Sequence, residues 1–123
     1  MKYICDTCVL IDYLRGRQEI KERLAADLDS GIAMSSVTYM ELMVGAFNKE
    51  EAIAIRKAFS SIGIIEISEP ISVKARELID TYTKSHGLLI PDALIAATAL
   101  ETGKPLYTLN VSDFRFINGI VLV

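Results

Sequence analysis

The stretch YICDTCVLIDYLRG, residues 3–16, joins a short apolar run to a second apolar segment through one aspartate. Residues 2–6 predict a strand, and residues 9–16 predict a short helix that ends at a glycine. Asp6 therefore comes where a buried strand gives way to a turn. A cysteine lies on each side of it in a C-x-x-C spacing, so either the carboxylate or the thiols could carry chemistry.

The same alternation of short apolar runs and longer helical segments continues along the chain. Strands separated by helices favour a parallel sheet with helices on both faces, so the sequence predicts an α/β fold. The helix at 91–103 is apolar nearly all round and is expected to be buried. Further strands are predicted at 32–35, 64–67, 106–109 and 120–123, and further helices at 18–31, 38–47, 50–62 and 72–87.

The length and composition are those of an ordinary globular domain. A chain of 123 residues fits a single domain, 1–123, with one substantial core. No segment approaches the roughly 20 apolar residues that span a bilayer, and the first residues lack the pattern of a signal peptide. We therefore expect a cytoplasmic protein with no membrane partner. The net charge of −3 is a weak argument against a nucleic-acid partner if several of the carboxylates share one site.

Four carboxylates are expected at one edge of the predicted sheet. Asp6 ends the first strand, and Glu41 lies in the first turn of the helix predicted after the second. Asp92 follows Pro91 at the start of the buried helix, and Asp113 comes after the fourth strand. Parallel α/β sheets place their ligand sites beyond the carboxyl ends of the strands, so we look for chemistry there.

Taken singly, these acidic residues also have local interpretations. Thr38 and Glu41 have capping-box spacing, Asp92 could stabilise a helix dipole, and Asn110 and Asp113 have the spacing of a cap. Taken together they favour a site, because two carboxylates about 4 Å apart repel by about 4 kcal/mol at a dielectric of about 20. Hard oxygen ligands with few histidines or cysteines favour Mg²⁺ or Mn²⁺.

Three segments in this order and spacing resemble the PIN-domain family, and most closely its VapC-like toxins. They are ICDTCVLIDYLRG, SSVTYMELMVG and LLIPDALIAATALETGKPLYTLNVSDF. The resemblance implies a three-layer α/β/α fold with a parallel five-stranded sheet of order 3-2-1-4-5. It also implies a Mg²⁺- or Mn²⁺-dependent endoribonuclease that hydrolyses RNA phosphodiester bonds as the toxin of a type II toxin–antitoxin pair. A homodimer and a small antitoxin protein that blocks the site are further implications.

The resemblance also assigns residues. Asp6, Glu41, Asp92 and Asp113 match the catalytic, metal-binding acidic positions of the family, and Thr7, Thr108 and Asn110 match supporting polar positions. The position of Cys8 is often Asn or Ser in the family.

Other polar residues have weaker claims. Cys5 and Cys8 are more consistent with packing than with a redox pair, because Cys5 lies inside the predicted strand. His86, in a last helical turn, is not expected to act as a general base. Arg15 and Arg17 either belong to a solvated helix face or contact RNA phosphate.

Two alternatives to a nuclease stay open from the sequence. One is a PIN-fold module that docks RNA or protein without catalysis. The other is a receiver domain that accepts a phosphoryl group, suggested by GKP at 103–105 but weakened by the absence of an aspartate after the third strand. Met40 and Met43 are expected in the core, with an interface role as the alternative.

Overall fold

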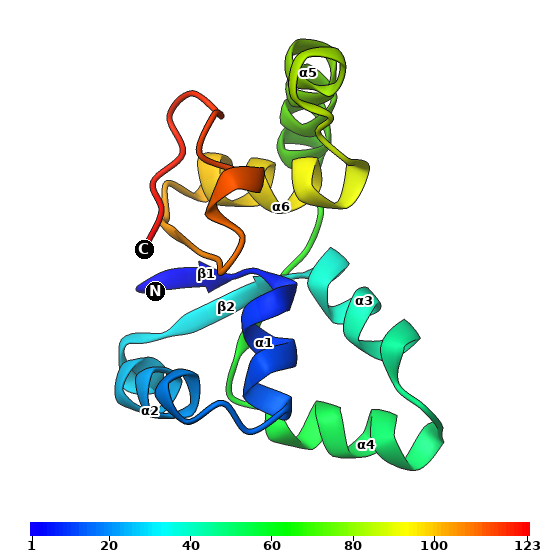
Figure 1. The fold of residues 1–123 in the computed structure, drawn as a ribbon, viewed down its shortest axis with the longest axis vertical. Coiled ribbons are helices and arrows are strands. Elements are labelled where there is room, and N and C mark those ends of the chain that lie inside the picture. The colour runs from blue at the N-terminus through cyan, green and yellow to red at the C-terminus, as the bar shows by residue number, and fades with distance from the viewer.

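The computed structural model describes all 123 residues and contains one parallel sheet (Figure 1). The strands lie in the order β3-β2-β1-β4, and each neighbouring pair is parallel. The strands are β1 (Tyr3–Cys5), β2 (Ile32–Ser35), β3 (Gly63–Ile65) and β4 (Leu106–Tyr107). The predicted parallel α/β sheet, with the order 3-2-1-4 for its first four strands, is confirmed.

The prediction of a fifth strand at 120–123 is wrong, because this segment does not form a regular strand. This segment lies beside β4, as the expected order requires, but only Leu106 and Leu122 form a bridge. The backbone N–H of Leu106 donates to Val121 O at 2.8 Å, and Val123 N–H donates to Leu106 O at 2.9 Å. Because β4 is only two residues long, it offers no ladder along which a fifth strand could extend.

Six α-helices connect and cover the strands, and most begin where the sequence supplies a capping side chain. Asp6, Ser35, Asn48 and Ser68 each accept a backbone N–H at a helix start. The helices are α1 (Thr7–Leu14), α2 (Gln18–Asp27), α3 (Ser36–Gly45), α4 (Lys49–Ala58), α5 (Glu69–His86) and α6 (Ile90–Thr102), with short 3₁₀ turns η1 (Leu28–Ser30) and η2 (Val111–Asp113). No helix is both long enough and apolar enough to cross a membrane.

The sheet separates two apolar cores, so the fold has three layers. Tyr3 and Cys5 point into a core shared with α1, α2, α3 and α4. Ile4, between them, points into a second core shared with α5 and α6. This alternation follows from the two-residue period of a strand. In Figure 1 the helices α5 and α6 lie on one side of β1 and β2, and α1 and α2 lie on the other.

Helix α6 is buried, as expected, and its buried face is built from small side chains. Ala93, Ala96, Ala97 and Ala99 are each at most 2% exposed. Small residues allow close approach to α5 and the sheet. The start of α6, which carries Asp92, is therefore placed by close packing against both layers.

In helix α3, only one of the two methionines that were predicted to be buried lies against the core. Met40 is 51% exposed, so its predicted place in the core is wrong, whereas Met43 packs partly buried against the first core. Val44 and Phe47 are each 87% exposed, and the buried residues of α3 are Val37, Thr38 and Leu42 instead. The helix is apolar on several sides, so periodicity alone could not decide which side faces inward.

Candidate active site

Asp6 is held firmly at the carboxyl end of β1. It is 5% exposed and caps α1, with Oδ1 accepting the backbone N–H of Thr7 at 2.8 Å. Oδ2 accepts the hydroxyl of Thr108 at 2.8 Å and the thiol of Cys8 at 3.2 Å. Since Thr108 follows β4, these bonds tie the ends of two neighbouring strands to one carboxylate.

Glu41 reaches the same edge from α3 through Thr7. Thr7 Oγ1 lies 2.8 Å from Glu41 Oε1 and 3.0 Å from Thr38 Oγ1. A hydroxyl has one proton and a carboxylate can only accept, so Thr7 donates to Glu41 and can accept from Thr38. The predicted capping box is wrong, because α3 begins at Ser36 with Ser35 as its cap. Glu41 therefore lies in the second helical turn.

Asp92 lies half-buried in the first turn of α6. Burial, together with the negative charges of Asp6, Asp113 and Glu41, raises its pKa to about 6. A helix N-terminus by itself would favour the ionised carboxylate. The pKa of Asp92 is raised although the residue lies in the first turn of α6.

Asp113 ends η2 and is exposed, and it acts on the site through its charge. Its backbone N–H donates to Asn110 O at 3.0 Å, while the Asn110 side chain makes no cap hydrogen bond. Asn110 N–H donates to Thr108 Oγ1 at 3.0 Å, which orients the hydroxyl proton of Thr108 toward Asp6. Asn110 thus supports Asp6 indirectly, through its backbone.

The four carboxylates differ in burial, and as a set they suit a hydrated divalent cation. Asp6 and Asp92 are the more buried pair, and Glu41 and Asp113 are exposed. No three His, Cys, Asp or Glu side chains lie close enough together to enclose a metal ion. Mg²⁺ commonly uses only one or two carboxylates and keeps several waters, so the donor set fits such an ion.

Comparison with known proteins agrees with this geometry. The sequence profile of the PIN domain matches residues 3–116. The chain belongs to the PIN-domain family. Among its relatives are VapC ribonucleases: the chain is 36% identical over 117 residues to ribonuclease VapC19 of Mycobacterium tuberculosis, covering 93% of this chain and 92% of that protein.

Solved structures place this PIN-domain chain in the same group. A toxin–antitoxin complex from Klebsiella pneumoniae has a chain that is 37% identical, with a TM-score of 0.80 over 98% of this chain and 96% of that one. VapBC2 from Rickettsia felis, bound to a promoter DNA fragment, has a TM-score of 0.86 at 26% identity, with 100% and 98% coverage. The predicted membership of the VapC-like branch is confirmed.

The cysteines of this PIN-domain chain are free and poorly ionisable. Burial raises the pKa of Cys5 to about 12 and that of Cys8 to about 11, and the charge of Asp6 adds to both shifts. Reactive cysteines have lowered pKa values, so a redox pair is not supported. Cys8 contacts Asp6 directly and also accepts the backbone N–H of Leu109 at 3.4 Å. It thus makes the kind of supporting hydrogen bonds expected at a position that is often Asn or Ser in the family.

The two arginines near the first helix have different surroundings. Arg17 Nη1 lies 3.0 Å from Asp12 Oδ2, and its Nε donates to Glu19 at 2.8 Å, so its charge is paired. Arg15 is 77% exposed, with only a long 3.7 Å contact to Asp12. Arg15 also lines a groove with Glu41. Of the two candidate phosphate contacts, Arg15 is thus the one with an available charge.

This groove, here named the α1–α3–α4 groove, has a volume of about 690 Å³ and reaches the acidic edge at Glu41. It is lined by Ile11, Leu14, Arg15, Glu41, Leu42, Gly45, Glu51, Ala54, Ile55 and Ala58.

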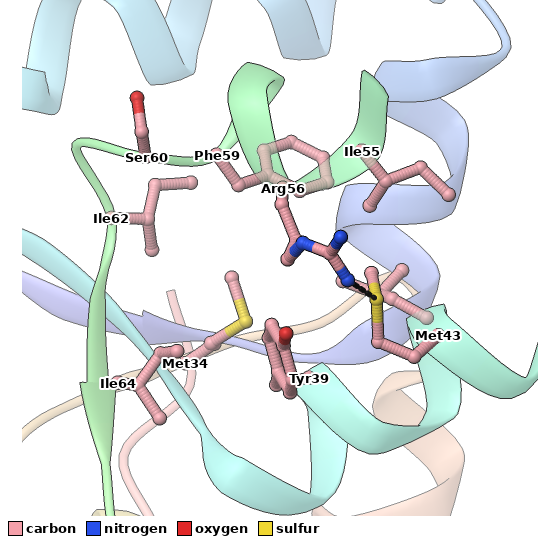
Figure 2. A pocket seen from close by; sticks show the side chains of 10 residues that line it. Met34, Tyr39, Met43, Ile55, Arg56, Phe59, Ser60, Ile62 and Ile64 are labelled. Carbon is pink, nitrogen blue, oxygen red and sulfur yellow. Dashed lines mark hydrogen bonds between the residues drawn. The ribbon is translucent and has the colours of Figure 1, made fainter. Parts of the chain in front are cut away.

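A separate pocket of about 290 Å³ lies between α3, α4 and β3 (Figure 2). Its walls are largely apolar, with Tyr39, Phe59 and Ile62 among them, and Arg56 Nη1 contacts Met43 Sδ at 3.7 Å. None of the four carboxylates lines it. This pocket is therefore separate from the acidic edge.

Proposed function

We propose that this VapC-family chain is a metal-dependent endoribonuclease whose catalytic centre is the acidic edge formed by Asp6, Glu41, Asp92 and Asp113. The observation that carries the proposal is that Asp6 and Glu41 are held together through Thr7 at the carboxyl edge of the sheet, where the charges of Asp6, Asp113 and Glu41 also act on Asp92. A cluster of this kind is stabilised by a cation, and clustered perturbed carboxylates are typical of catalytic sites.

Asp6 and Asp92 are the residues we expect to hold Mg²⁺ or Mn²⁺, with Glu41 and Asp113 at the rim. When bound, the cation supplies the positive charge that activates water and offsets the charge developing on the phosphate. Asp6 is suited to this role because Thr108, Cys8 and the Thr7 backbone fix both of its oxygens. Outer hydrogen bonds of this type commonly determine how well a ligand binds its metal.

Thr7, Thr108 and Asn110 act as positioning residues in this proposal. The Thr7 hydroxyl holds Glu41 toward Asp6, while the Thr7 backbone N–H donates to the Asp6 carboxylate. Thr108 links Asp6 to the end of β4, and Asn110 orients Thr108. Arg15 lies beside Glu41 in the groove with little charge pairing, so it is placed to contact an RNA phosphate.

The direct test is cleavage of RNA with Mg²⁺ or Mn²⁺ by the purified protein. We expect Asp6→Asn to lose at least about a hundredfold in cleavage rate, because the acidic cluster loses its most firmly held member. Asp80→Asn, an exposed change on α5, is the matched control and should cleave like the parent. Equal cleavage by the parent and Asp6→Asn would reject the assignment and favour a PIN-fold module that only binds.

We further propose that a cognate antitoxin occupies the α1–α3–α4 groove. The relatives from Klebsiella and Rickettsia are solved as toxin–antitoxin and VapBC assemblies. The groove offers apolar walls, including Ile11 at 36% exposure and Leu14 at 41%, and it ends at Glu41. A segment lying there would cover the acidic edge.

The groove assignment is tested with the cognate antitoxin of this chain. Ala54→Trp fills the groove without altering a carboxylate. The variant should cleave RNA normally but resist inhibition by that antitoxin by about tenfold or more. Val121→Glu, an exposed change at the other edge of the sheet, serves as the control. Normal inhibition of Ala54→Trp would place the antitoxin elsewhere.

A homodimer is the third part of the proposal. Met40, Val44 and Phe47 form an exposed apolar surface on and just beyond α3, and such surfaces usually have a partner. We assign a second copy of the chain to it. Val44→Asp should shift the protein toward monomer in sedimentation equilibrium, whereas Val121→Glu should not. An unchanged mass for Val44→Asp would exclude this surface as the dimer contact.

A further inference from the structure

Three aromatic rings, here named the aromatic triad, lie together where the end of α5 meets the loop that follows η2. The rings of His86 and Phe116 are stacked, with centroids 4.3 Å apart and planes at 12°. Tyr82 meets Phe116 at 5.2 Å and 60°, and meets His86 at 5.8 Å and 72°. None of these residues belongs to the acidic edge.

Packing and hydrogen bonding within the fold explain Tyr82 and Phe116 but not His86. The Tyr82 hydroxyl accepts the backbone N–H of Asn118 at 3.0 Å, and Phe116 packs partly buried against the second core. Gly87 ends α5 in the left-handed conformation, with its N–H bonded to Thr83 O at 2.9 Å, so His86 is not needed as a cap. His86 is exposed, and one face of its ring covers Phe116.

The triad joins the two chain segments that deliver Asp92 and Asp113. Phe116 is three residues beyond Asp113, a separation that spans at most about 10 Å even when extended. The chain there is turned by hydrogen bonds from Arg115 N–H and Ile117 N–H, which shortens the distance. His86 precedes Asp92 by six residues. A single-stranded substrate held at the acidic edge thus has neighbouring nucleotides within reach of the stack.

Two unpaired cations flank the aromatic triad. Arg115 and Lys84 are exposed and form no ion pair, in contrast to Arg17 and Lys74. Asp80, one helical turn before Lys84, does not pair with it. Exposed aromatic rings with free cations are the combination that binds single-stranded nucleic acid, because bases stack on the rings while phosphates contact the charges.

We propose that the His86–Phe116 stack is a binding platform for an unpaired base of the RNA substrate, next to the phosphate held at the acidic edge. The platform rests on the proposed ribonuclease function. Arg115 and Lys84 contact the adjoining phosphates. Stacking is tolerant of base identity, so the platform selects unpaired RNA over duplex and does not select a sequence.

Binding is measured on the full chain carrying Asp6→Asn, so that cleavage does not interfere. The probe is a fluorescent single-stranded RNA of mixed sequence. His86→Ala should raise the Kd by about fivefold or more, since one base stack contributes about 1–3 kcal/mol. His86→Phe keeps an aromatic surface and should bind like the parent. Arg115→Gln should weaken binding and reduce its salt dependence, whereas Arg76→Gln, an exposed change earlier on α5, should do neither.

Thermal unfolding separates binding from a merely structural role. His86 is exposed, so His86→Ala should keep the Tm of the parent. An unchanged Kd for His86→Ala, or a lowered Tm without a change in Kd, overturns the platform. The proposed nuclease function fails separately, if the chain with Asp6 intact binds this RNA through His86 and does not cleave it with Mn²⁺.

Discussion

The hydroxyl of Thr108 donates a 2.8 Å hydrogen bond to Oδ2 of Asp6, across a sequence separation of 102 residues. Asp6 ends β1 and Thr108 follows β4, and these two strands are neighbours in the sheet. The carboxylate is therefore oriented by the sheet itself and not by a flexible loop. Sites built on regular elements hold their geometry well, which suits a catalytic carboxylate.

Replacing Thr108 should weaken metal binding without unfolding the protein. Thr108→Val keeps the size but removes the donor to Asp6, and it should lower Mn²⁺ affinity about tenfold. The stability loss should be about 1–3 kcal/mol, because the change removes both the hydrogen bond to Asp6 and the one accepted from Asn110 N–H. Calorimetric titration with Mn²⁺ and urea unfolding measure the two effects. Thr108→Ser restores the donor and should recover the affinity; if it binds as weakly as the valine variant, the hydrogen bond is not the cause.

The thiol of Cys8 should be unreactive in the folded protein. Burial raises its pKa to about 11, so very little thiolate is present at neutral pH. We expect slow reaction with a thiol-specific disulfide reagent, becoming rapid after denaturation in urea. Cys5, with a pKa of about 12, should behave in the same way. Rapid labelling of the native protein at either residue would contradict this environment.

Asp92 should make the metal-free protein less stable as pH rises. Its pKa is about 6 when folded against an ordinary 3.8, so the folded state binds more protons between these values. The free energy of unfolding then falls as pH rises from about 4 to about 6, and the full penalty remains above that range. With chelator present, Asp92→Asn should be more stable than the parent at pH 8 by about 1 kcal/mol, allowing for solvent screening.

The same comparison near pH 4 provides the control for Asp92. Both residues are then uncharged, and the advantage of Asp92→Asn should shrink toward zero. Asp80→Asn, which is exposed, should show no comparable pH dependence. An advantage that is equal at both pH values would mean that burial of charge is not its source.

Divalent cations should stabilise the parent protein and fail to stabilise Asp6→Asn. A ligand at a hundred times its Kd adds about 2.7 kcal/mol to the stability of the state that binds it. We expect Mn²⁺ to raise the Tm of the parent and a chelator to reverse the rise. Asp80→Asn should respond as the parent does. A similar rise in Asp6→Asn would place the stabilising cation at a different site.

The sequence predicted the acidic edge because topology, and not local pattern, determines it. Once the strands are parallel, residues after different strands converge, so Asp6 and Asp113 could be grouped although 107 positions separate them in the printed chain. The local pattern suggested that Thr38 and Glu41 form a capping box. This was wrong, because Ser35 caps the helix in place of Thr38, so α3 starts earlier. Two capping residues three apart leave the boundary open to tertiary packing.

Other features depend on contacts that a linear pattern does not contain. The charge of Arg17 is balanced by its ion pairs with Asp12 and Glu19, whereas Arg15 in the same basic run is exposed and weakly paired. Met40 is exposed because α3 has apolar residues on more sides than the core can cover. The fifth strand fails since β4, its only neighbour, is too short to pair with it.

The small side chains along the buried face of α6 have a genetic consequence. Ala93, Ala96 and Ala97 are completely buried, and a larger residue at any of them would displace the helix whose first turn carries Asp92. Overpacking of this kind typically costs about 1–3 kcal/mol. A selection for cells that survive expression of this chain should therefore recover larger residues in place of these alanines, alongside changes in the carboxylates. Many of the variants with a replaced alanine should be temperature-sensitive.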